Sequence, residues 1–257
     1  MARSRDQLHV AFGAAVIALT VGCSVRENVT QPPAPETTFA VPKPPPPTID
    51  PDDFVDSIDN EFFPLSPGTT YYYEGVSDGV PTSDVFYVTH QTKRILDVRC
   101  IEVHDQAYEA GVLVEDTFDW FAQDIDGNVW YFGEDTKELD EQGNVVSTNG
   151  SWMAGVDGAL PGIIMLANPQ KGDRYEQENA PGVAEDRARV LSLDESASVP
   201  YGEFDNLLRT EDSTPLDRST VEHKCYAKDI GFVLGVAIRG SDDITELVNI
   251  TTRGPQD

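Results

Sequence analysis

The sequence predicts an all-β fold, an antiparallel meander that forms a barrel, a half-barrel or a sandwich and has few or no long helices. From residue 69 onward, short runs rich in Val, Ile, Thr, Tyr, Phe and Trp alternate with turn dipeptides such as Asp78-Gly79 and Gln142-Gly143. These glycines supply the positive φ that tight hairpins require. No long segment has helical periodicity, and about ten to twelve strands are expected at hairpin spacing.

Residues 1–22 have the pattern of an export signal, a basic start followed by an apolar stretch that is too short to span a bilayer. The run Leu19-Thr20-Val21-Gly22-Cys23 resembles a bacterial lipoprotein signal. That resemblance implies that Cys23 becomes the lipidated N-terminus and anchors the chain in a membrane through acyl chains. Ser24 at the next position favours the outer membrane. An ordinary cleaved signal peptide is the alternative.

Residues 23–50 are dense in proline and poor in large apolar side chains. This composition favours an extended polyproline II spacer. We therefore expect a signal peptide over 1–22, a lipid-anchored tether over 23–50 and a single β-rich domain over 51–257. A short helical turn is expected near the start of the domain, over 53–60.

The chain has 18 Lys and Arg against 45 Asp and Glu, a formal net charge of -27. This charge excludes nucleic acid as a partner, because the phosphate backbone would be repelled. It also excludes docking on anionic lipid through a basic patch. The acidic residues indicate either a solvated surface suited to a saline medium or binding of Ca²⁺.

Cys100 and Cys225 form an even pair once Cys23 is lipidated. In an oxidising compartment they are candidates for a disulfide, and two separate buried thiols are the alternative.

Strand alternation identifies candidate acids. In the run 112–121, Asp116 shares the more apolar face, so we expect it to point into the core or a cavity. Asp186 shares a face with small apolar residues, and Glu178 is a third candidate. A desolvated carboxyl group is a candidate catalytic acid, base or ligand. The alternative is a carboxylate paired with Arg or hydrogen-bonded to the backbone.

The hairpin tip Asp124, Asp126 and Asn128 is similar to the start of an EF-hand calcium loop, but Val129 stands where that loop requires Gly. A plain turn motif is the alternative. His90, His104 and His223 are candidates for a transition-metal site if strand pairing brings them together, and otherwise are ordinary polar residues.

The stretch 155–172 holds four glycines and two prolines around Ile163, Ile164, Met165 and Leu166. It is interpreted either as a long loop across a barrel mouth, with an apolar plug that contacts a ligand, or as a connection between two halves of the sheet.

From residue 63 onward the chain resembles a family of uncharacterised secreted bacterial proteins. The matching residues are the runs 116–135 (DTFDWFAQDIDGNVWYFGED) and 154–162 (AGVDGALPG), Gln177-Glu178 and Ala184-Glu185-Asp186. This family implies no activity. The run 227–233 (AKDIGFV) is loosely similar to envelope lipoproteins with open, lipid-cradling half-barrels.

The sequence thus predicts a cell-envelope lipoprotein that binds a hydrophobic small molecule or an envelope protein. One alternative is a calcium-supported hydrolase that acts on polysaccharide through Asp116, Glu178 and Asp186. A purely structural envelope component is the other. The HExxH, CxxC, GxSxG, Walker A and GxGxxG motifs are absent, so the sequence favours none of the enzyme classes that they mark.

Overall fold

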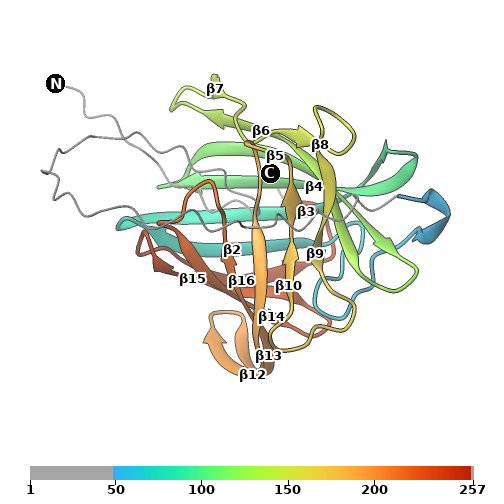
Figure 1. Ribbon diagram of the computed structural model, residues 1–257. Coiled ribbons are helices and arrows are strands. Elements are labelled where there is room, and N and C mark those ends of the chain that lie inside the picture. The colour runs from blue at the N-terminus through green and yellow to red at the C-terminus, as the bar shows by residue number, and fades with distance from the viewer. Residues whose placement is uncertain (1–48, 256–257) are drawn as a thin grey trace, which may run out of the picture.

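The computed structural model describes residues 49–255 and is all-β, as predicted (Figure 1). The domain opens with one 3₁₀ turn, η1 (Pro51–Asp53), in which Asp50 caps the backbone N–H of Asp52. The strands are β1 (Phe54–Val55), β2 (Thr70–Ser77), β3 (Val80–Ile95), β4 (Val98–Glu109), β5 (Val112–Asp124), β6 (Val129–Leu139), β7 (Val145–Ser147), β8 (Trp152–Met153), β9 (Leu160–Met165), β10 (Arg174–Glu176), β11 (Glu178–Asn179), β12 (Arg187–Val199), β13 (Gly202–Ser213), β14 (Val221–Ala227), β15 (Gly231–Arg239) and β16 (Ile244–Thr251).

The helical turn predicted over 53–60 is wrong. Pro51 fixes the first position of the 3₁₀ turn, and the chain then leaves it as the short strand β1, which pairs with the end of β5. No helix within residues 49–255 is long and apolar enough to cross a membrane.

The strands form one antiparallel sheet in the order β10-β12-β13-β14-β15-β16-β2-β3-β4-β5-β6-β9-β11. Two meanders, β2 to β6 and β12 to β16, are joined where β16 pairs with β2. The two ends of the sheet, β10 and β11, are separated in sequence by Gln177 alone. The sheet therefore curls back on itself and almost closes into a barrel (Figure 1).

The closing seam of the barrel is the place where β9, β11 and the start of β12 meet. Strand β9 pairs with both β6 and β11, and β10 pairs with β12. The backbone N–H groups of Gln177 and Glu178 both donate to the carbonyl oxygen of Asp186, at 2.7 and 3.2 Å. A few short strands therefore complete the wall between the two meanders.

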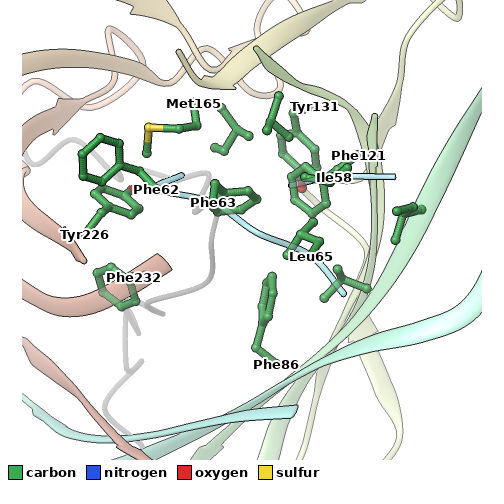
Figure 2. Packing of buried hydrophobic residues seen from close by; sticks show 14 of the residues in the cluster. Ile58, Phe62, Phe63, Leu65, Phe86, Phe121, Tyr131, Met165, Tyr226 and Phe232 are labelled. Atoms are coloured by element: carbon green, nitrogen blue, oxygen red, sulfur yellow. The ribbon is translucent and has the colours of Figure 1, made fainter. Parts of the chain in front are cut away.

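The interior is filled by the segment that precedes β2. Ile58, Phe62, Phe63 and Leu65 are each at most 4% exposed. Figure 2 shows Phe63 in the middle of the cluster and Phe62 beside Tyr226, with labelled side chains around them from both meanders and from β9: Phe86, Phe121, Tyr131, Met165, Tyr226 and Phe232. The rings of Phe63 and Phe121 make an edge contact at 5.5 Å. The chain thus supplies its own apolar plug.

Hydrogen bonds hold this plug in place. Asn60 donates through Nδ2 to the carbonyl oxygens of Gly127 and Leu166, at 2.9 and 3.1 Å. Its own backbone N–H and that of Asp59 donate to Oε1 of Gln123, both at 2.9 Å. These bonds satisfy buried backbone groups of a segment that has little secondary structure.

Candidate functional site

Several buried acids lie on the inner wall of the barrel, Glu115 of β5 among them. Asp84, Asp105, Asp119, Glu134 and Glu178 come from β3, β4, β5, β6 and β11 and are between 1% and 8% exposed. We call these five residues the interior carboxyl cluster. Asp119 and Glu134 are directly opposite each other in the register of β5 and β6. Burial of so many acids is unusual, because a charged carboxylate loses its hydration inside a protein.

Tyr131 lies between two members of the cluster. Its phenol oxygen is 2.5 Å from Oδ1 of Asp119 and 3.1 Å from Oε2 of Glu134. A phenol has one proton to donate, so it can serve both carboxyls only if one of them is protonated and donates in return. The ring of Tyr131 is fixed by stacking on Phe121 and by an edge contact with Trp152.

Several carboxyl oxygens of the cluster have no side-chain hydrogen-bond partner within the described part of the chain. They are Oδ2 of Asp119, Oε1 of Glu134 and both Oε atoms of Glu178. Asp84 and Asp105 share a hydrogen bond with each other. Buried polar atoms are nearly always hydrogen-bonded in folded proteins. The inner wall therefore presents acceptor groups that the described residues do not satisfy.

Burial raises the pKa of every member of the cluster. For Asp84 the pKa rises to about 7, and a hydrogen bond with Asp105 limits the increase. Burial raises the pKa values of Asp105, Asp119, Glu134 and Glu178 well above their ordinary range, and neighbouring acids add to the effect. The cluster therefore holds protons at neutral pH that exposed acids would have lost.

Other acids of the barrel interior are compensated by a buried ammonium group. Lys224 on β14 lies 3.4 Å from Asp212 and 3.5 Å from Glu222, and its side chain is 12% exposed. Burial by itself lowers the pKa of Lys224, but the charges of Glu222, Asp212 and Asp186 outweigh burial and raise it. Burial likewise raises the pKa of Asp186 to about 6, with Lys224 opposing the shift.

The predicted orientation of Asp116 is wrong. Asp116 is on the half-exposed face of β5, where it accepts hydrogen bonds from Nε2 of His104 at 2.7 Å and from Nε2 of Gln106 at 3.2 Å. The inner face of β5 carries Thr117 and Asp119 instead. The face with more apolar residues was expected to point inward, but the inner wall of the barrel is polar at this point. Phe118 lies on the outer face, where it stacks on His104.

Glu178 and Asp186 are brought together at the seam, and Asp116 is not with them. Glu178 is fully buried and Asp186 is half-buried, and the charge of Asp186 adds to the raised pKa of Glu178. The three acids named for a hydrolase thus do not form one site. Asp84, Asp105, Asp119 and Glu134 were not predicted from the sequence. Side chains two residues apart on a strand share a face, so an acid two residues from a buried apolar residue, as Asp105 is from Val103, could have been predicted to point inward.

The candidate calcium residues form a turn. Asp124 accepts hydrogen bonds from the backbone N–H and Nδ2 of Asn128 and from Nε1 of Trp130, at 2.7 to 2.9 Å. Oδ1 of Asn128 accepts from the backbone of Ala167. Asp126 is exposed, and with Asp124 it lines a hollow of about 260 Å³. Ca²⁺ at this turn stays a prediction.

The histidines do not meet. His104 lies opposite Tyr87 in the register of β3 and β4, because the pairing is shifted between Val88 and Thr92. Across residues 49–255, no group of three or more His, Cys, Asp or Glu side chains is arranged to hold a metal ion.

Cys100 and Cys225 are free thiols, so the predicted disulfide is not formed. They belong to β4 and β14, strands of different meanders, and each is buried. Burial raises the pKa of Cys100 to about 12 and that of Cys225 to about 11. The alternative of two separate buried thiols therefore describes the structure. Cys23, the signal peptide and the tether as far as residue 48 lie outside the described residues.

The apolar loop predicted at 163–166 is also corrected. Ile163, Ile164 and Met165 belong to strand β9, and Leu166 follows it directly. Ile164 and Met165 are buried in the core, while Ile163 and Leu166 are half-buried. The stretch pairs with the sheet because β6 and β11 offer it hydrogen-bonding edges on both sides.

Neither a scan against protein-family models nor a search of curated proteins gave a match. Two solved structures are similar to the chain: a presumed exported protein with a YmcC-like fold from Bacteroides fragilis, and a presumed lipoprotein from Parabacteroides distasonis. Their identities are 16% and 14%, and each match covers 75% of this chain and 99% of the other, with a TM-score of 0.44. The resemblance to a family of secreted proteins stays a prediction.

Proposed function

We propose that this chain is a lipid-anchored protein of the cell envelope, held at the outer membrane by Cys23, whose β domain binds a small polar ligand at the interior carboxyl cluster. The anchor is supported by the lipoprotein-type run before Cys23 and by the proline-rich tether that follows it. The binding role is supported by the interior of the barrel.

One observation underlies the binding role. Glu178 is 2% exposed, and no side chain of the described residues donates a hydrogen bond to either of its carboxyl oxygens, while a hydrogen bond with the backbone of Asp186 lowers its pKa. Asp119 and Glu134 each have one such oxygen beside it. An unsatisfied buried polar group costs about 1–3 kcal/mol, so a molecule that brings hydrogen-bond donors to this wall would be stabilised there.

A polar ligand replaces the hydrophobic ligand expected from the sequence. Ile164 and Met165 contribute to the protein's own core, and Figure 2 shows Phe62 and Phe63 near Met165. The apolar surface named for a ligand is therefore already covered by the chain itself.

The anchor is tested by fractionation of cells that express the full chain. The wild-type protein is expected in the membrane fraction, with an N-terminal peptide whose mass includes acyl chains on Cys23. Cys23→Ala is expected in the soluble envelope fraction. A wild-type protein with no acyl mass would overturn the anchor.

The binding role is tested by native mass spectrometry of the full chain, released from detergent after incubation with a small-molecule extract of the producing cells. An added mass in the wild type that is lost in Glu178→Gln supports the proposal. Glu176→Gln is the matched control, because Glu176 is two residues away and exposed. The mass of the acylated chain alone in the wild type, or an added mass kept by Glu178→Gln, would overturn it.

A further inference from the structure

We infer that the ligand of the interior carboxyl cluster carries a primary ammonium group, as a short aliphatic diamine does. This inference rests on the proposed binding function and specifies the class of ligand. It follows from the charge balance of the cluster, from the chemistry of the unsatisfied atoms and from the example of Lys224, an ammonium group among carboxylates in the same barrel.

The charge balance of the cluster differs from that around Lys224. The charged neighbours that shift the pKa values of Asp84, Asp105, Asp119 and Glu134 are all acids, and the charge of Lys224 reaches Glu178. Asp212 and Glu222, by contrast, are both paired with Lys224. Buried charges are generally paired, so full ionisation of the cluster requires a cation in addition to Lys224.

Lys224 provides the local precedent for that cation. Its ammonium is surrounded by carboxylates from β13 and β14 at 3.4 to 3.5 Å, in the same barrel interior. An ammonium group has three donors that can reach three separate acceptors. The cluster offers unsatisfied acceptors on Asp119, Glu134 and Glu178. These acids are neighbours, because Tyr131 contacts both Asp119 and Glu134, and the charge of Glu178 raises the pKa of Glu134.

The arrangement favours a ligand with directed donors over a single metal ion. A metal ion needs several ligand atoms that converge on one point, and the acids of the described chain do not form such a group. The unsatisfied oxygens instead come from separate strands, β5, β6 and β11. A diamine can span separated carboxyl groups with N–H donors at both ends.

The seam offers the ligand a way in. Glu178 belongs to β11, a strand of two residues that pairs with β9 through Pro161 and Leu160 and is held on its other side by the bond from its N–H to Asp186. Opening so short a strand breaks few backbone hydrogen bonds, and local opening is least costly in such segments. Entry at β11 would bring the ammonium first to Glu178.

The test is calorimetric titration of the full chain in detergent with 1,4-diaminobutane. Its permethylated analogue, 1,4-bis(trimethylammonio)butane, is the control ligand because it has the same charge and no N–H donor. We expect one site per chain for the diamine and at least tenfold weaker binding of the analogue. Because burial raises the pKa values of the cluster acids, we expect binding of the diamine to release protons, which titrations in buffers of different ionisation enthalpy detect.

The variants locate the site. Glu178→Gln and Asp119→Asn are expected to weaken diamine binding at least tenfold and to reduce the proton release. Glu176→Gln and Asp116→Asn remove the same charges from exposed or half-exposed positions and should bind as the wild type does. Two cluster variants are used so that a folding defect in one, detected by its melting temperature, leaves the other informative.

Three results would overturn the inference: equal binding of the diamine and its permethylated analogue, binding without proton release, and binding that Glu178→Gln and Asp119→Asn leave unchanged. Binding of Ca²⁺ or of a neutral sugar in place of the diamine, lost in the same two variants, would also overturn it. That last result would leave the proposed binding function intact, which separates the failure of the two proposals.

Discussion

Gly162 of β9 lies so close to Gln177 that a Cβ added at Gly162 would be 2.1 Å from the carbonyl oxygen of Gln177. Gln177 is the residue that separates the two ends of the sheet. The barrel closes at this point because a residue without a side chain allows the two backbones to approach each other. Gly162 is therefore a structural requirement of the seam.

Gly162→Ala is expected to destabilise the domain by about 1–3 kcal/mol, because backbone atoms must shift to admit the methyl group. Chemical denaturation of the variant and the wild type measures the difference. Gly202→Ala is the control, since a Cβ at Gly202 would have no atom within 4 Å and should change stability little. Equal stability of Gly162→Ala and wild type would show that the seam tolerates a wider spacing.

Stability is expected to increase as the pH falls from 8 to 5. Burial raises the pKa of Asp84 to about 7 and raises those of the other cluster acids further above their ordinary range. An acid whose pKa is raised by folding makes its full contribution to the free energy of unfolding below its unfolded pKa, near 4. That contribution is lost as the pH rises through the folded pKa. Thermal unfolding across this pH range measures the slope.

Asp84→Asn isolates one part of that slope. The amide keeps a neutral donor and acceptor at this position, so the variant should be more stable than the wild type at pH 8, on the order of 1 kcal/mol, and no more stable at pH 4. Asp126→Asn, at an exposed position, is the control for the change in net charge. A gain of equal size at both pH values would contradict the assignment.

The sequence predicts the strands well because period-two alternation and turn dipeptides are local features. It does not predict the inner face of β5, because the choice of face depends on which wall closes around it. Asp119 and Asp116 look alike in sequence, yet one is buried beside Tyr131 and the other pairs with His104 at the half-exposed surface. Burial of Phe62 and Phe63 inside the barrel was likewise not predicted from the sequence, because it depends on contacts with strands far away in the chain.

Glu178 was found from the sequence, but its surroundings were not. The strand β11 has two residues, too few to show any alternation, and its place at the end of the sheet is fixed by pairing with β9. The carboxyl cluster around it combines acids from five strands. Such a site is defined by sheet register, which a sequence leaves open until the order of strands is known.

Removal of the buried ammonium tests the compensated wall. Lys224→Met leaves Asp212 and Glu222 buried without the cation that balances them, and should destabilise the domain by about 3–5 kcal/mol. Lys228→Met is the matched control, because Lys228 pairs with Glu61 at an exposed position where such pairs contribute about 0–1 kcal/mol. Urea denaturation of both variants gives the comparison, and equal losses would contradict the assigned role of Lys224.

The two thiols are expected to react only after unfolding. Cys100 and Cys225 are buried and free, and burial raises the pKa values of both, so little thiolate is available to a reagent. Thiol titration of the acylated full chain should label neither cysteine under native conditions and both in denaturant. A reducing agent should leave the melting temperature unchanged. A chain two hydrogens lighter than its sequence, or a melting temperature lowered by reduction, would show instead that β4 and β14 are joined by the disulfide.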